Sequence, residues 1–180
     1  VVIAMLDPNP LVAGKGVQDL REANIRVESG LMQAEAEALN PGFIKRMRHG
    51  TPRVVVKTAM SLDGRTALAS GESRWITAED ARADVHRLRA RSSAIVTGVG
   101  TILQDDPMLN ARLPNHIDVV QPLRVILDSN LRTSPAAKIF SNSEKVVIYS
   151  TLAVSATSEK FSSMNVDVHH VSDVNGHTNL

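Results

Sequence analysis

Apolar runs of three to six residues alternate with amphipathic stretches through the first fifty positions. The runs predict strands, and the amphipathic stretches predict helices. The predicted order is strand Val1–Met5, helix Val17–Ala23, strand Ile25–Val27 and helix Ala34–Asn40. Such an alternation is typical of an α/β fold with parallel strands. Because Val1 stands inside a strand-like run without an initiator Met, we expect a piece of a longer protein; the alternative is a complete protein with frayed ends.

The same alternation continues after Arg53. The predicted elements are strand Val54–Val56, a helix capped by Thr77 and ending near Arg91, strand Ala94–Thr97, a short helix over Thr101–Leu103, strands Leu123–Leu127 and Lys145–Tyr149, helix Glu159–Ser163, strand Val166–Val171 and a turn at Asn175–Gly176. In the long helix, Ala81, Val85 and Leu88 follow the i, i+4, i+7 spacing that predicts one buried face.

A basic stretch, Lys45–His49, separates the two parts of the pattern. A nucleic-acid contact is one interpretation. A solvated charged face is the commoner role of such a stretch, and we favour it. We place the domain junction here, with one domain over residues 1–50 and a second over 51–180.

Composition narrows the function classes. The chain of 180 residues is 43% hydrophobic and 22% charged, which predicts a globular protein. Its net charge of +1 offers no broad field for nucleic acid or an anionic membrane, and its apolar runs fall short of the roughly 20 residues that span a bilayer. The absence of cysteine excludes disulfides, thiolate nucleophiles and zinc sites with sulfur ligands, and it allows a reducing compartment.

A glycine turn is the first candidate site. Gly98-Val99-Gly100 follows a predicted strand and opens a helix, so that backbone N–H groups could approach a phosphate. The dinucleotide fingerprint needs a third small residue where this chain has Leu103, and we therefore reject a standard Rossmann site. An ordinary glycine turn is the alternative. The six histidines show no H-x-E or H-E-x-x-H spacing, so no metal site is predicted.

Charged side chains at element ends are the other candidates. Lys57 ends a run of three valines, where an ammonium would face a ligand or extend into solvent from a frayed strand end. Asp105 and Asp106 precede a proline and could handle protons or simply terminate a helix. Arg82 and Arg89 lie seven apart on one helical face, where they could hold a phosphate or be solvated.

Several ordered motifs together resemble the bifunctional deaminase/reductase family of riboflavin biosynthesis. The reductase-like motifs are Lys57–Ala67, Ser70–Thr77, Asp105–Pro107 with Leu109 and Arg112, and Val125–Ser129. The deaminase-like motifs are Asp7–Pro10, Val12–Gly16, Glu35–Glu37 and Asn40–Phe43. The resemblance covers essentially the whole chain. It implies the tail of a cytidine-deaminase-like domain followed by an incomplete dihydrofolate-reductase-like domain.

The resemblance also implies a reaction and its residues. NADPH would reduce the ribosylamino side chain of 5-amino-6-(5-phosphoribosylamino)uracil to the ribitylamino form. The implied catalytic residues are Lys57 and Asp105; the implied cofactor-binding residues are Ala59, Trp75, Thr101, Asp105 and Ser129; the implied substrate-binding residues are Ser73, Arg89, Leu109 and Arg112. Trp75 could instead fill the core. The family further implies a cytoplasmic enzyme that needs no nucleic acid or membrane, and a homo-oligomer stays open.

Two departures from the family are visible. The zinc motifs of its deaminase domain, H-x-E and P-C-x-x-C, are absent, so we expect no deamination by this chain itself. A later glycine-rich cofactor loop and a substrate-facing acid also lie outside it. A noncatalytic nucleotide or sugar-phosphate binding module is therefore the second hypothesis, and an RNA-binding protein built on Lys45–His49 is the third.

Overall fold

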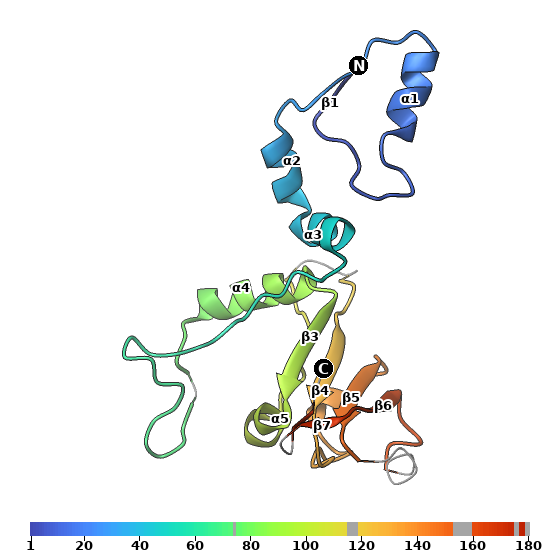
Figure 1. The fold of residues 1–180 in the computed structure, drawn as a ribbon. Coiled ribbons are helices and arrows are strands. Elements are labelled where there is room, and N and C mark those ends of the chain that lie inside the picture. The colour runs from blue at the N-terminus through green and yellow to red at the C-terminus, as the bar shows by residue number, and fades with distance from the viewer. Residues whose placement is uncertain (74, 115–118, 153–159, 175–176, 179–180) are drawn as a thin grey trace. The chain divides into compact units, whose positions relative to one another are not determined.

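The computed structural model describes residues 1–73, 75–114, 119–152, 160–174 and 177–178. The chain divides into two compact units, residues 1–58 and residues 59–180, which are described separately. Figure 1 shows the first unit from blue to teal and the second from green to red.

The first unit contains a small strand–helix–strand arrangement. Its elements are β1 (Val2–Ile3), α1 (Lys15–Glu22), β2 (Glu28–Ser29), α2 (Gln33–Leu39) and α3 (Pro41–His49). β1 and β2 pair in parallel, as the alternating pattern predicted. The second strand lies just beyond the predicted Ile25–Val27, since Glu28 and Ser29 are the residues that pair with Val2 and Ile3. Val27, directly before them, is buried.

The basic stretch belongs to α3. Pro41 occupies the first turn of this helix and Gly50 ends it in the left-handed region, with φ of 70°. Arg48 forms a two-pronged ion pair with Glu37 of α2, with Nη1 3.0 Å from Oε2. The hydrogen bonds from Arg48 and Gln33 lower the pKa of Glu37 to about 2. One of the stretch's cations is thus already paired, which favours the solvated charged face over a nucleic-acid contact.

The second unit is built on a parallel sheet. Its elements are α4 (Glu79–Ala90), β3 (Ala94–Gly98), α5 (Val99–Asp105), β4 (Leu123–Leu127), the 3₁₀ helix η1 (Lys138–Phe140), β5 (Val146–Ser150), β6 (Val166–His170), β7 (Asp173–Val174) and β8 (His177–Thr178). The strand order of the four-stranded sheet is β3-β4-β5-β6, and all three pairings are parallel. The predicted α/β class is confirmed.

The two central strands carry the core. Ile126 of β4 and Ile148 of β5 are fully buried and pack with Ile139, Val146 and Phe161. Such continuous apolar runs are expected for strands covered on both faces. The predicted strand Leu123–Leu127 is confirmed residue for residue, and the three strands near it are displaced by one residue at most. β3 lies at one edge, where Val96 is 56% exposed.

The strand predicted over Val54–Val56 is wrong. These residues adopt no regular secondary structure, and Val54 and Val56 are 74% and 83% exposed. Strand propensity forms a strand only where a neighbouring strand accepts the backbone hydrogen bonds, and no described strand pairs with this run. Lys57 is likewise exposed rather than placed at the end of a buried strand.

The buried face predicted for the long helix is also wrong. No residue of α4 is buried: Val85 is half-buried and Leu88 is 37% exposed. The half-buried side chains include Arg82, His86 and Arg89, which have the same i, i+4, i+7 spacing on a different face. The helix begins after Ala78 without a side-chain cap, so the predicted Thr77 cap is wrong too. α4 is held by polar contacts to a loop, which an apolar periodicity cannot reveal.

The remaining sequence predictions concern the end of the chain. Lys160–Ser163 form a turn rather than the predicted helix, whereas Glu159 and the Asn175–Gly176 turn lie outside the described residues. Within the part of the chain that the structure describes, no helix combines the length and apolarity needed to cross a membrane.

Asp128 fixes the turn that follows β4. Its carboxylate is fully buried and accepts hydrogen bonds from the backbone N–H of Arg132 (3.0 Å), the backbone N–H of Thr133 (2.8 Å) and the Thr133 hydroxyl (2.7 Å). A buried carboxylate with three donors is well satisfied, and removing it leaves all three without an acceptor. The turn therefore depends on this one side chain.

We predict that Asp128→Ala lowers the free energy of unfolding of the second unit by at least about 3 kcal/mol, because several charge-assisted hydrogen bonds are lost at a buried site. Amide hydrogen exchange in β4 and β5 measures the loss. Asp84→Ala is the matched control, since Asp84 is exposed and pairs only with Arg87 at 3.8 Å. Equal protection in the two variants would contradict the assignment.

Candidate active site

Two of the residues expected to bind the cofactor lie just beyond the carboxyl ends of two neighbouring strands. Thr101 lies in α5, directly after β3, and Ser129 lies two residues beyond the end of β4. Gly98 of β3 is opposite Leu127 of β4 in the parallel register. The carboxyl ends of parallel strands form the edge where ligands bind in open α/β sheets. Thr101 and Ser129 therefore lie just beyond the carboxyl ends of β3 and β4, which run side by side in Figure 1.

The glycine turn between β3 and α5 leaves open space at this edge. Gly98 has φ of −80° and ψ of 155°, a conformation that any residue adopts. A Cβ added at Gly98 or Gly100 would meet no atom within 4 Å. Neither backbone strain nor protein packing requires glycine here, so the bare turn suits the close approach of a ligand.

Hydroxyl groups surround Ser129. Its carbonyl oxygen accepts hydrogen bonds from the hydroxyls of Ser150 and Thr151, both at 2.9 Å, and its own hydroxyl accepts the backbone N–H of Thr178 at 3.2 Å. Ser150 ends β5 and Thr151 follows it. The hydroxyls of Ser150 and Thr151 thus fix the backbone of Ser129, whose own hydroxyl proton is not used in that contact with Thr178.

The two aspartates at the end of α5 have different positions. Asp106 caps α5 in the left-handed region and accepts the backbone N–H of Lys138 at 2.8 Å, with the Lys138 ammonium 3.4 Å away. That backbone hydrogen bond, followed by the side-chain hydrogen bond and the charge of Lys138, lowers the pKa of Asp106. Asp106 thus joins α5 to η1. Asp105, the predicted catalytic residue, is the half-buried last residue of α5.

The loop after Asp106 is held against α4. Leu109 is buried and has φ of 51°. Gln121 forms two hydrogen bonds with the backbone of Ala111, at 2.8 and 2.9 Å. Arg89 of α4 donates from Nη1 to the carbonyl oxygen of Asn110 at 3.1 Å. These contacts fix the backbone on both sides of Asn110.

Arg112, at the end of this loop, lies beside His86. Its backbone nitrogen is 3.2 Å from His86 Nδ1, and its guanidinium Nη2 is 3.3 Å from His86 Nε2. Three of the four residues expected to bind the substrate, Arg89, Leu109 and Arg112, thus belong to one arrangement of α4 and its neighbouring loop. The fourth, Ser73, is half-buried in the irregular segment before α4, and its contact with them stays a prediction.

The arrangement is electrostatically positive. Burial, and then the charge of Arg112, lowers the pKa of Arg89. Burial also lowers the pKa of His86, with further contributions from the charges of Arg112 and Arg89. The ion pairs among the described residues join neither arginine to a carboxylate. Guanidinium groups placed together in this way suit a phosphate or a carboxylate.

Trp75 is not part of the core. Its indole is 72% exposed and lies under the guanidinium of Arg82, 4.4 Å from the ring centroid. Arg82 also donates to the carbonyl oxygen of Thr77 at 2.6 Å. Arg82 shares a face of α4 with His86 and Arg89, so an open aromatic surface lies near the same helical face.

The other predicted residues lie on either side of the boundary between the two units. Lys57 is exposed in the first unit, and Ala59 is half-buried at the start of the second. A meeting of Lys57 with Asp105 and Arg89 stays a prediction. In the described residues, no three His, Asp or Glu side chains lie close enough to bind a metal ion.

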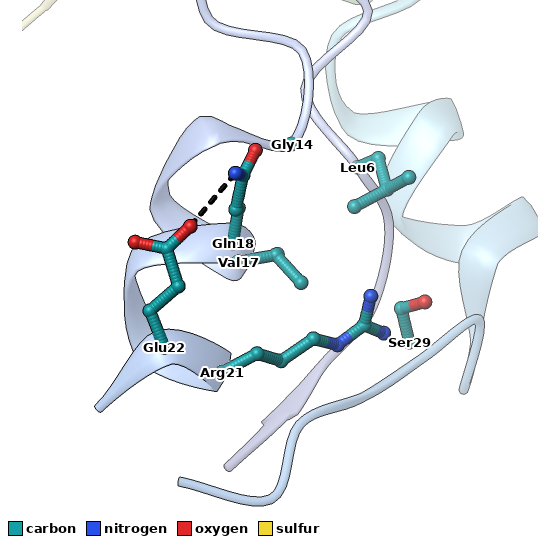
Figure 2. A pocket seen from close by; sticks show the side chains of 7 residues that line it. All are labelled: Leu6, Gly14, Val17, Gln18, Arg21, Glu22 and Ser29. Carbon is teal, nitrogen blue, oxygen red and sulfur yellow. Dashed lines mark hydrogen bonds between the residues drawn. The ribbon is translucent and has the colours of Figure 1, made fainter. Parts of the chain in front are cut away.

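A hollow of about 560 Å³ lies in the first unit, and none of the residues that line it is a predicted site residue. Figure 2 shows Leu6 and Val17 on its wall, Arg21 reaching toward Ser29, and a 2.8 Å hydrogen bond from Gln18 to Glu22. Apolar and singly charged groups are mixed here without a convergent set, so the hollow offers no reaction site.

Comparison with known proteins decides the family. The RibD C-terminal domain family matches residues 52–175, which include the sheet, α4 and the positively charged loop. The chain belongs to the RibD C-terminal domain family. The predicted resemblance to the riboflavin biosynthesis family is thereby confirmed.

Individual RibD proteins agree with this assignment. The chain is 48% identical to riboflavin biosynthesis protein RibD of Haemophilus influenzae over 161 residues, which are 84% of the chain and 43% of that protein. It is 50% identical to RibD of Escherichia coli over 149 residues, covering 77% of the chain and 41% of the relative. The chain therefore spans less than half the length of these relatives.

Solved RibD structures have the same fold. Acinetobacter baumannii RibD matches with a TM-score of 0.85 and 46% identity, covering 97% of the chain and 48% of that structure. A Thermotoga maritima diaminohydroxyphosphoribosylaminopyrimidine deaminase/5-amino-6-(5-phosphoribosylamino)uracil reductase matches with a TM-score of 0.76 and 32% identity, over 96% and 54% of the two chains. The RibD likeness confirms the predicted dihydrofolate-reductase-like class.

Sequence reasoning missed His86, although a signal was present. Arg82 and Arg89 were recognised as one helical face, and His86 lies between them at the same spacing, i+4 from Arg82 and i−3 from Arg89. The contact from Gln121 to Ala111 has no comparable signal, because it joins two loop segments whose approach depends on the fold.

We predict that His86 makes the protein less stable in mild acid. Its folded pKa is lowered, so the unfolded chain binds a proton near the ordinary value of 6.5 more readily than the folded chain does. The stabilising effect of the neutral ring is present above that pH and is lost as the pH falls. Between pH 7.5 and 5.5, His86→Gln should therefore lose less free energy of unfolding than the unsubstituted protein. Urea titrations test this, with Arg87→Gln as control, and equal pH slopes would contradict it.

Proposed function

We propose that this chain carries the reductase part of a riboflavin biosynthesis enzyme. In the proposed reaction, NADPH reduces the ribosylamino side chain of 5-amino-6-(5-phosphoribosylamino)uracil to a ribitylamino side chain. The observation that carries the proposal is the pair Arg89 and Arg112, two cations brought to one loop without a carboxylate partner among the described ion pairs. A sugar phosphate is an anion that both guanidinium groups can bind. The name of the Thermotoga relative supports the same substrate.

The sheet edge fits a nicotinamide cofactor. Thr101, Ser129 and the bare glycine turn provide hydroxyls and open space at neighbouring strand ends. The exposed face of Trp75 can stack on a planar ring. When bound, NADPH supplies a hydride to the anomeric carbon of the open-chain imine. Ala59, Trp75, Thr101, Asp105 and Ser129 are the residues proposed to hold the cofactor there.

The chain's own residues have to move protons. Opening the ribose ring places a proton on the ring oxygen and removes one from the glycosidic nitrogen, which gives the imine. After reduction, that nitrogen takes up a proton and becomes a secondary amine. Lys57 and Asp105 are the proposed proton-handling groups, because an ammonium and a carboxylate can serve as acid and base at these two atoms. Arg89 and Arg112 hold the terminal phosphate and so orient the sugar.

Deamination, the other activity in the name of the Thermotoga relative, is not proposed for residues 51–180. Residues 1–50 are proposed to be the end of a deaminase domain, and zinc would be bound only by a portion outside this chain, which contains no cysteine. A cytoplasmic location is part of the same proposal and agrees with the absence of cysteine.

We predict that Arg112→Ala raises the KM for the phosphorylated substrate about 10- to 100-fold with little change in kcat, because charge-assisted hydrogen bonds to the phosphate are lost. Arg89→Ala should act in the same direction. Steady-state assays of the complete protein, in which NADPH oxidation is followed, measure the change in KM. Arg87→Ala is the matched control on α4, and substrate without its phosphate should show no difference among the variants. An unchanged KM for both arginine variants would refute the phosphate anchor.

We predict that Lys57→Ala and Asp105→Ala each lower kcat at least about 100-fold, since general acid–base groups contribute factors of this size. Far-UV circular dichroism should show unchanged folding. Lys15→Ala serves as control for loss of a surface ammonium. Unaltered turnover in both variants would remove these residues from the reaction.

A further inference from the structure

We propose that His86 is a third phosphate-binding residue: Nδ1 accepts the backbone N–H of Arg112, and Nε2–H donates to the phosphate beside the Arg112 guanidinium. The inference rests on the proposed function, which places a phosphate on Arg89 and Arg112. It adds a neutral donor that also orients the loop carrying one of the two cations.

The positions of the two ring nitrogens carry the argument. Nδ1 is 3.2 Å from the backbone nitrogen of Arg112, and Nε2 is 3.3 Å from Nη2 of the same residue. Both groups of Arg112 can only donate hydrogen bonds. A neutral imidazole has one acceptor nitrogen and one N–H, so it can accept from only one of these donors.

The backbone N–H of Arg112 cannot turn away, because Gln121 holds the adjacent residue through both its backbone groups. Nδ1 is therefore the acceptor, and Nε2 carries the proton. Nε2–H then faces the guanidinium of Arg112, which leaves two donors side by side without an acceptor between them. The opposite tautomer moves the conflict to the backbone N–H of Arg112. A protonated ring would face a donor of Arg112 at each nitrogen, and only the backbone contact with Asn110 favours its proton.

A phosphate resolves the conflict. One of its oxygens can accept from Nε2–H and another from the Arg112 guanidinium, so that both donors are satisfied. A phosphate monoester carries a charge of about −1.5 to −2 near neutral pH, which Arg89 and Arg112 together can balance. His86 then contributes a donor without a third positive charge, in agreement with its lowered pKa.

Among the described residues, the charged groups that shift the pKa of His86 are Arg112 and Arg89, both cations. Arg89 and Arg112 repel a protonated ring, and the backbone of Asn110 provides a hydrogen bond that favours it. Arg82 lies one helical turn earlier on α4 and is stacked on Trp75. No carboxylate among the described residues forms an ion pair with His86. An anion bound at Nε2 would therefore change the proton affinity of the ring strongly.

Kinetics provide the first test. His86→Ala should raise the KM for the phosphorylated substrate about tenfold and leave kcat within about twofold, as expected for loss of one charge-assisted hydrogen bond. His86→Gln, which retains one donor and one acceptor, should recover part of the affinity. Arg87→Ala is the control on the same helix. The His86→Ala effect should disappear when the substrate lacks its phosphate.

Nuclear magnetic resonance of the ring nitrogens provides a test that does not depend on turnover. In the full chain, His86 should be the Nε2–H tautomer at neutral pH. Addition of ribose 5-phosphate should raise the pKa of His86, whereas ribose should leave it unchanged. Phosphate binding that leaves the His86 resonances and pKa unmoved would overturn the inference.

The two proposals fail differently. If Arg112→Ala raises the KM and His86→Ala does not, the inference about His86 is wrong and the proposed function stands. If neither substitution changes the KM, the phosphate anchor is wrong and both proposals fall together.

Discussion

The site depends on one constraint: side-chain hydrogen bonds from Arg89 of α4 and from Gln121 fix the backbone of Asn110 and Ala111. Arg89 fixes the carbonyl of Asn110, and Gln121 fixes Ala111. This places Arg112 beside Arg89 and His86, although like charges repel. The sheet supplies the rigidity, because its two central strands are buried on both faces and anchor the segments that lead into and out of the loop.

An arrangement that is unfavourable by itself is informative about function. The pKa of Arg89 is lowered in part by the charge of Arg112, and the His86 imidazole faces two donors of Arg112. An anion would stabilise all three side chains, and no described ion pair provides one. Natural sequences depart from local consistency chiefly where a ligand completes the structure.

The sequence predicted the sheet well and the helix faces poorly. β4 was predicted residue for residue because Leu123–Leu127, apolar except for Arg124, lies between loop residues and is too short for a helix. Val54–Val56 has the same pattern but no described strand beside it, so pattern alone could not decide its structure. For the site, motif resemblance identified Arg89 and Arg112, which lie near one another, and Leu109, whose side chain packs in the hydrophobic core. It did not identify His86, whose importance follows from the direction of two hydrogen-bond donors rather than from residue type.

The most direct test is a crystal structure of the protein with ribose 5-phosphate bound. The account predicts phosphate oxygens within about 2.7–3.2 Å of the guanidinium nitrogens of both Arg89 and Arg112. A phosphate bound elsewhere, with both arginines keeping only their contacts to the protein, would contradict it.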